Sequence, residues 1–165
     1  MGAFVGRRRI SDGILISLTI GAALPYGAMI GKDTTDLTKG VVADTTATSP
    51  NFVGHLSQPT KVGGPTLDDL TWPDLYSQPV AVGGQVTLDR FQEIEAEGPA
   101  FILQSGTGAL TSGTAIGTLL SVKAGVLHVV QAGENATHRL TQVLTPETAG
   151  NVRIVADLLP AVVTI

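Results

Sequence analysis

Few residues of this 165-residue chain combine the types and spacing that enzyme chemistry requires. The three histidines, His55, His128 and His138, each stand alone within an apolar stretch, and the chain has no cysteine. A structural zinc site needs four Cys, His or carboxylate ligands, usually with two of them closely spaced. Isolated histidines without such companions are typical of core or surface positions, so we expect no metal site.

Neither the aspartates nor the glycine-rich segments match a ligand-binding motif. Asp68, Asp69 and Asp74 could bind a cation, but they lack the alternating spacing of a calcium loop. Segments 106–109 and 113–115 are rich in glycine, yet no Lys-Ser/Thr pair of a phosphate loop follows them. A serine nucleophile elbow is also missing. We therefore predict a protein that is not an enzyme and has no catalytic residue and no cofactor.

Three glutamates deserve separate consideration because they alternate along the chain. In a β-strand, Glu93, Glu95 and Glu97 would share one face. Acid–base catalysis by such a group needs a cleft that gives its members different pKa values, and the sequence indicates no cleft. We interpret the glutamates as an exposed acidic edge that discourages unwanted strand pairing.

Composition and charge narrow the class of protein. Charged residues form 15% of the chain and hydrophobic residues 43%, and the net charge is −4. Soluble domains carry about 25% charged residues on average, so this chain must cover its surface with Gly, Thr, Ser and small apolar side chains. Such a surface is typical of β-proteins that are partly covered by partners. The negative charge argues against nucleic-acid binding, which requires a basic face.

Short apolar runs separated by glycine and proline turns predict an all-β fold. We expect a small β-barrel, or a β-tulip or sandwich, of short antiparallel strands. A helical turn is the alternative for residues 90–97. The expected strands cover residues 14–20, 28–30, 40–43, 52–56, 79–82, 85–88, 90–97, 100–104, 117–123, 126–131, 138–144 and 151–159.

The expected domain organisation is an N-terminal arm over residues 1–12 and a single all-β domain over residues 13–165. Inside that domain, residues 57–78 form a long irregular loop that contains Trp72 and Tyr76. A loop of about twenty residues in a compact domain needs a function or a partner. Either the two aromatic side chains fix the loop on its own domain, or they anchor an interface with a neighbouring subunit.

The N-terminal segment allows more than one interpretation. Arg7, Arg8 and Arg9 precede an apolar run over residues 14–24, which is the outline of a secretory signal with a cleavage site near Ala23. The β-branched residues of that run disfavour a helix, and a membrane span is less favoured because the run is short and contains polar residues. The remaining interpretation is an exposed arm whose arginines are solvated or lie on an acidic partner.

Several stretches of the chain resemble the capsid decoration (cement, or head-stabilising) proteins of tailed phages. The similarity includes an alanine–apolar–Pro–aromatic–Gly opening, a Phe-Val-Gly strand after a polar loop, and a glycine turn before the last strand. The stretches are Ala23–Ile30, Gly40–Ala43 with Asn51–Leu56, Tyr76 leading into Pro79–Leu88, and Thr148–Val155. The segment around Trp72 departs from the family, since it is longer and more aromatic.

The resemblance implies a structural virion protein on the outer surface of an icosahedral phage capsid. Such a protein cements neighbouring subunits of the major capsid protein and often forms a homotrimer or another homo-oligomer, without nucleic-acid or membrane partners. Candidate contacts with the capsid or with other subunits are Arg7, Arg8, Arg9, Trp72 and Tyr76. The alternatives are a secreted or cell-surface β-sandwich binding module with a cleaved signal, and a small β-barrel enzyme or ligand-binding protein.

Overall fold

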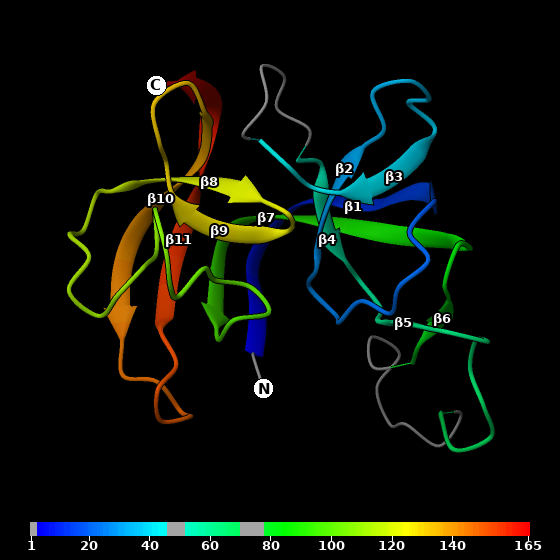
Figure 1. The fold of residues 1–165 in the computed structure, drawn as a ribbon. Helices are drawn as coiled ribbons and strands as arrows, with labels where there is room; N and C mark the ends of the chain where they lie inside the picture. Colours follow the sequence, from blue (N-terminus) through cyan, green and yellow to red (C-terminus); the bar gives the residue numbers. More distant parts are fainter. Residues whose placement is uncertain (1–2, 46–51, 70–77) are drawn as a thin grey trace.

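The computed structural model describes residues 3–45, 52–69 and 78–165. Eleven strands, β1 to β11, make up the architecture of these residues. The all-β fold with a small barrel is therefore confirmed. The strands form two lobes, and the two longest, β1 and β7, run through both (Figure 1).

The first lobe, here called the barrel lobe, is a closed five-stranded barrel. Its ring runs from β1 (Ala3–Leu18) through β3 (Lys39–Val42), β2 (Met29–Lys32), β4 (Gly54–Leu56) and β7 (Gln85–Glu97) back to β1. Only the β1–β3 pair is parallel. Closure leaves no free edge in this ring. The barrel interior is filled by Ile16, Leu18, Ala28, Ile30, Leu56, Val86 and Leu88.

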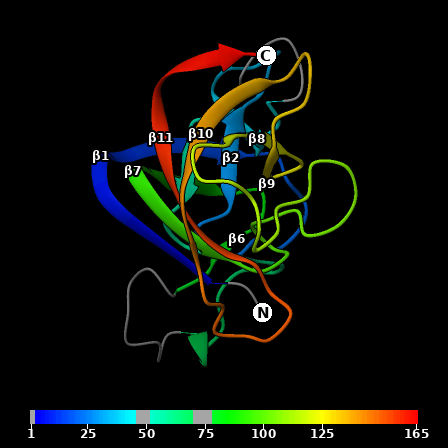
Figure 2. The same cartoon turned by 90° about the vertical axis from the view of Figure 1, so that its left-hand side faces the viewer.

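The second lobe, here called the sheet lobe, extends the far halves of β1 and β7. Its order is β1-β7-β11-β10-β8-β9, with β11 (Arg153–Thr164), β10 (Asn135–Leu144), β8 (Leu119–Lys123) and β9 (Val126–Val129). Figure 2 shows how β11 sweeps away from β7 towards the C-terminus. The buried core of this lobe includes Phe91, Ile94, Phe101, Ile102, Leu110, Leu120, Leu127, Leu140, Ile154 and Ala156.

The loop over residues 57–78 contains a little regular structure. Within its described part, β5 (Thr60–Lys61) pairs in parallel with β6 (Val80–Ala81), which follows the loop. The remaining described residues of the loop form turns and bends. Part of the loop is thus tied back to the barrel lobe by backbone hydrogen bonds.

Two expectations from the sequence are wrong. The segment Ala3–Ile10 is not an exposed arm, because it pairs with β7 over Phe91–Glu97 and buries Phe4 in the core. Residues 100–104 form turns rather than a strand, although Ile102 makes a single bridge to Leu127. Residues 90–97 are a strand and not a helical turn, since they belong to β7.

Candidate binding surface

The glutamates of β7 form ion pairs across three neighbouring strands. Arg7 on β1 donates to Glu93 Oε1 at 2.7 Å and to Glu95 Oε2 at 2.5 Å, while Arg153 on β11 donates to Glu95 Oε1. These hydrogen bonds raise the pKa of both arginines. The expected exposed acidic edge is therefore wrong, because β7 is an internal strand on which Glu93 and Glu95 pair with arginines. Glu97 is buried and accepts hydrogen bonds from the backbone N–H groups of Glu147 and Thr148.

The three consecutive arginines do not act as one basic group. Arg7 pairs with the glutamates of β7, whereas a guanidinium nitrogen of Arg9 lies 3.5 Å from a carboxylate oxygen of Asp89. The side chain of Arg8 is exposed, and its backbone has a positive φ of 53°. A positive φ is unusual for a residue with a side chain and marks an irregularity in the strand. The other two predicted contact residues, Trp72 and Tyr76, lie outside the described residues.

Two histidines lie in the interior on either side of Phe52. The ring centroids of His55 and His138 are each 5.2 Å from that of Phe52. The Nδ1 atom of His55 donates to the carbonyl of Gly27 at 2.8 Å, and Nδ1 of His138 lies 2.8 Å from Thr137 Oγ1. Within the described structure, neither Nε2 atom has a hydrogen-bond partner. Both rings therefore serve as core residues in their neutral form.

Burial keeps these two rings uncharged at neutral pH. Desolvation lowers the pKa of His55 to about 4. Desolvation, reinforced by the positive charges of His55 and Arg90, lowers the pKa of His138 to about 3. Either ring, if protonated, would carry a positive charge that is buried away from water without a compensating anion. These histidines are poor proton-transfer groups near pH 7.

The third histidine makes a hydrogen-bond contact with a glutamate that the sequence did not predict. His128 Nε2 lies 2.7 Å from Glu134 Oε2, and the same oxygen accepts a hydrogen bond from the backbone N–H of Gln131 at 2.9 Å. Glu134 thus ties β9 to the turn that precedes β10. The short gap between the expected strands 126–131 and 138–144 was the sequence signal that could have suggested the pair.

Asp69 fixes the described part of the long loop, whereas Asp74 lies outside the described residues. Asp69 Oδ2 accepts hydrogen bonds from Lys61 Nζ at 2.9 Å, and from the backbone N–H and hydroxyl of Thr66 at 2.6 and 2.9 Å. The bond from Lys61 contributes most to lowering the pKa of this carboxyl. No group of three or more potential ligands could hold a metal ion among the described residues.

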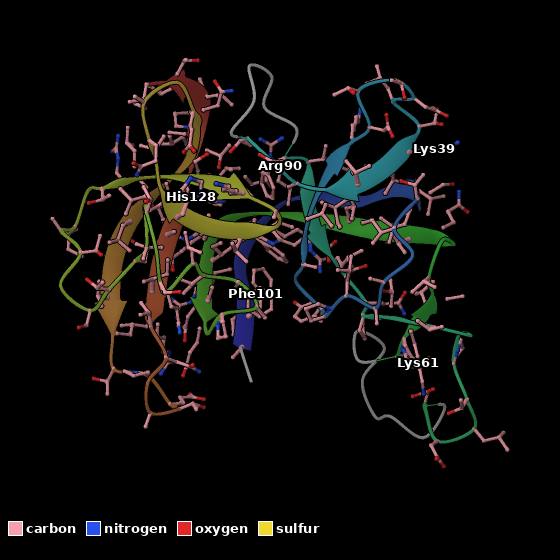
Figure 3. The ribbon with its side chains drawn as sticks, viewed as in Figure 1. Lys39, Lys61, Arg90, Phe101 and His128 are labelled. Carbon is pink, nitrogen blue, oxygen red and sulfur yellow. The ribbon has the colours of Figure 1, made fainter. Side chains whose placement is uncertain are left out.

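A concave feature of the described surface lies where the two lobes meet. This junction groove has a volume of about 470 Å³ and is lined by Ile10, Ile14, Arg90, Gln92, Leu158, Leu159 and Pro160. A second hollow of about 190 Å³ shares Arg90 and residues 158–160 with it and continues to Phe52, Thr137, Ala161 and Val162. Arg90 thus lies between two adjoining hollows, at the boundary of the two lobes (Figure 3).

Strand irregularities on both sides of β7 create this groove. Between Arg9 and Ser11, β1 advances by two residues while β7 advances by one, so Ile10 is an additional residue. On the other side, the register of β10 and β11 leaves Thr137 opposite the four residues 159–162. Bulges of this kind bend a strand and turn its side chains out of the regular alternation. They direct the residues of the groove away from the sheet.

The groove combines apolar walls with one charged group. Ile10 and Val162 at its margins are 52% and 45% exposed, which is high for large apolar side chains. Arg90 is half-buried, and its guanidinium makes no hydrogen bond or ion pair with the part of the chain that the structure describes. A half-buried cation that has no counter-charge among the described residues, with exposed apolar side chains at the margins of its groove, is a feature of binding surfaces.

Comparison with known proteins does not assign the chain to a family. A scan against protein-family models finds no match, and a search of curated proteins finds no relative. Across the described residues, no helix is both long and apolar enough to cross a membrane. The function must therefore be inferred from the chain and its surface.

Proposed function

We propose that this chain is a structural virion protein that binds the outer surface of an icosahedral phage capsid and cements neighbouring major capsid protein subunits. The observation that supports this role best is the exposed apolar surface around the junction groove, with Ile10, Pro160 and Val162 as members. Exposed apolar side chains that cluster with an unpaired cation favour a protein partner over solvent. The resemblance of short sequence stretches to decoration proteins is the reason for proposing the major capsid protein as that partner.

The architecture suits a protein that bears load between subunits. Because β1 and β7 belong to both lobes, backbone hydrogen bonds connect the lobes through continuous strands. A rigid body loses little conformational entropy when it binds, so more of its contact energy is available for binding. A protein that binds only the assembled lattice stabilises that lattice by mass action, and repeated contacts add through avidity.

The competing role as a secreted module with a cleaved signal requires removal of residues up to about Ala23. Those residues include the whole of β1, which closes the barrel and contributes Phe4, Ile16 and Leu18 to the two cores. Cleavage would open the ring between β3 and β7 and expose both edges. This contribution of β1 favours the capsid role over the secreted one.

The test is binding of the purified full-length chain to empty shells assembled from the major capsid protein of the same virus. We expect the chain to sediment with shells, not to bind unassembled capsid subunits, and to raise the temperature at which shells dissociate. Light scattering on the free chain measures whether it is a homotrimer or another oligomer. Failure to sediment with shells, or equal binding to unassembled subunits, contradicts the proposal.

A further inference from the structure

We infer that the junction groove binds an extended segment of the partner protein that presents one carboxylate between apolar side chains, with Arg90 as the counter-charge. This inference rests on the proposed function only for the identity of the partner, which would be the capsid subunit. The chemistry of the bound segment follows from the groove itself, through the position of Arg90, the apolar walls and residues 159–162 of β11, which have no regular strand partner among the described residues.

Arg90 supplies the argument for a carboxylate. The side chain lines both hollows, is half-buried, and makes no hydrogen bond or ion pair with other described residues. Arginine offers five N–H donors in a planar fork that matches a carboxylate with two parallel hydrogen bonds. The neighbouring part of β7 shows this preference, since Arg7 and Arg153 each pair with a glutamate there. Arg90 lies on β7 itself, and its guanidinium has no such carboxylate partner among the described residues.

The walls of the groove supply the argument for apolar neighbours of that carboxylate. Ile10 and Ile14 of β1 line the groove together with Leu159 and Pro160 of β11. An acidic side chain alone would leave these residues in contact with water, whereas flanking apolar side chains would cover them. Removal of water from around the guanidinium also strengthens its attraction to a carboxylate, because the local dielectric falls.

The backbone of β11 supplies the argument for an extended segment. Its pairing with β7 ends at Asp157, and residues 159–162 bulge away from β10. This stretch therefore has a strand edge without a regular partner among the described residues. Extended peptides add to such edges through main-chain hydrogen bonds, with alternate side chains in neighbouring pockets. Pro160 has no N–H and limits the pairing to its neighbours.

The first experiment uses defined probes and needs no capsid. The probes are fluorescent, end-blocked octapeptides of alternating valine and threonine with one central glutamate, and a counterpart in which glutamine replaces that glutamate. Fluorescence anisotropy with the full-length chain should show at least tenfold tighter binding of the glutamate peptide. R90Q should remove this preference, and I10D should weaken both peptides.

Matched controls separate the groove from general surface effects. Arg139 is exposed on β10, and Ile116 is 61% exposed in a loop, and neither lines the groove. R139Q and I116D should therefore bind both peptides as the parent chain does. Thermal melts establish that each variant folds. R90E should reverse the preference towards a peptide with a central lysine, which distinguishes charge pairing from damage to the fold.

The outcomes distinguish this inference from the proposed function. Equal binding of the glutamate and glutamine peptides by the parent chain, no binding of either at millimolar concentration, or an equal effect of R139Q and R90Q overturns the inference. Shell binding that R90Q leaves unchanged also overturns it, while the capsid role stands. A parent chain that distinguishes the peptides but ignores shells supports the groove and contradicts the capsid role. An oligomer that R90Q dissociates would show that a second copy occupies the groove, which contradicts a partner segment.

Discussion

Mild acid should destabilise this protein through two buried histidines. His55 and His138 are about 1% exposed, and each has a ring nitrogen without a hydrogen-bond partner in the described structure. Burial lowers the pKa of His55 to about 4 and that of His138 to about 3, from an unfolded value of 6.5. Between pH 6.5 and these folded values, the unfolded chain binds more protons than the folded one. The free energy of unfolding must therefore fall as the pH falls.

The expected loss in free energy of unfolding can be calculated for a pH range in which the protonation of carboxylates changes little. A pH of 5 is about 1.5 units below the unfolded pKa of 6.5 and still above the folded pKa of each histidine. One pKa unit corresponds to about 1.4 kcal/mol, so each ring contributes a loss of about 2 kcal/mol and the pair about 4 kcal/mol. A typical domain has only about 5–15 kcal/mol of stability in total.

Urea unfolding at pH 7.5, 6.5, 5.5 and 5.0 measures this loss directly. H55F is the matched variant, because it keeps a ring next to Phe4, Phe52 and Phe91 but cannot titrate. It gives up the hydrogen bond to Gly27, so its stability at pH 7.5 should fall by about 1–3 kcal/mol. Its further loss between pH 7.5 and 5 should be about half that of the parent chain.

Two results would refute the reasoning. One is a free energy of unfolding that stays within about 1 kcal/mol between pH 7.5 and 5, where the pair is expected to contribute about 4. The other is an H55F chain with the same pH dependence as the parent, which would mean that His55 is accessible to protons in the folded state. Proton NMR titration of the ring protons then gives both folded pKa values independently.

Three further predictions concern the packing of the lobes. T45V should cost about 1–3 kcal/mol in urea unfolding, because the buried hydroxyl accepts a hydrogen bond from the Val122 N–H at 2.8 Å and valine would leave that donor unpaired; an unchanged midpoint contradicts this. G27A should cost more than about 1 kcal/mol, since Gly27 has a φ of 84° and a Cβ there would lie 2.3 Å from the ring of Phe4; a crystal or NMR structure with an unmoved ring would contradict the stated cause. Deletion of residues 1–22 removes β1 and should abolish the cooperative thermal transition that circular dichroism detects in the full chain; a sharp transition in the truncated chain would show that the barrel closes without β1.

Local pattern predicted the fold class well because strands leave a local signature. The alternation over residues 90–97 favoured a strand, which is correct. Short apolar runs with glycine turns correctly predicted an all-β fold, with a small barrel among the expected architectures. The partners of each strand were not predictable in the same way. Arg7 lies 86 residues from Glu93, and nothing near either residue indicates the other. Three successive arginines therefore suggested a solvated arm, although the register of β1 brings one of them onto the glutamates.

The candidate site was harder to predict for a related reason. The groove depends on an extra residue at Ile10 and on four residues of β11 opposite Thr137, and such bulges have little sequence signature. Pro160 was a weak signal, because proline inside a strand indicates an edge or a bulge. The sequence around Arg90 did not distinguish it from the other arginines. What distinguishes Arg90 is that Arg7 and Arg153 form ion pairs, whereas Arg90 forms none with the described residues.

The pairing of β1 with β7 determines when this chain can fold during synthesis. β1 is synthesised before Gln85–Glu97, its main partner, and the ring cannot close until that segment has been made. Until then β1 to β4 lack the strand that closes the barrel, and their apolar side chains have no enclosed interior in which to pack. Contacts this distant in sequence slow folding, because a long loop must close before they form. The nascent chain must therefore wait for its second half, and folding should be a late, concerted event in which both lobes form together.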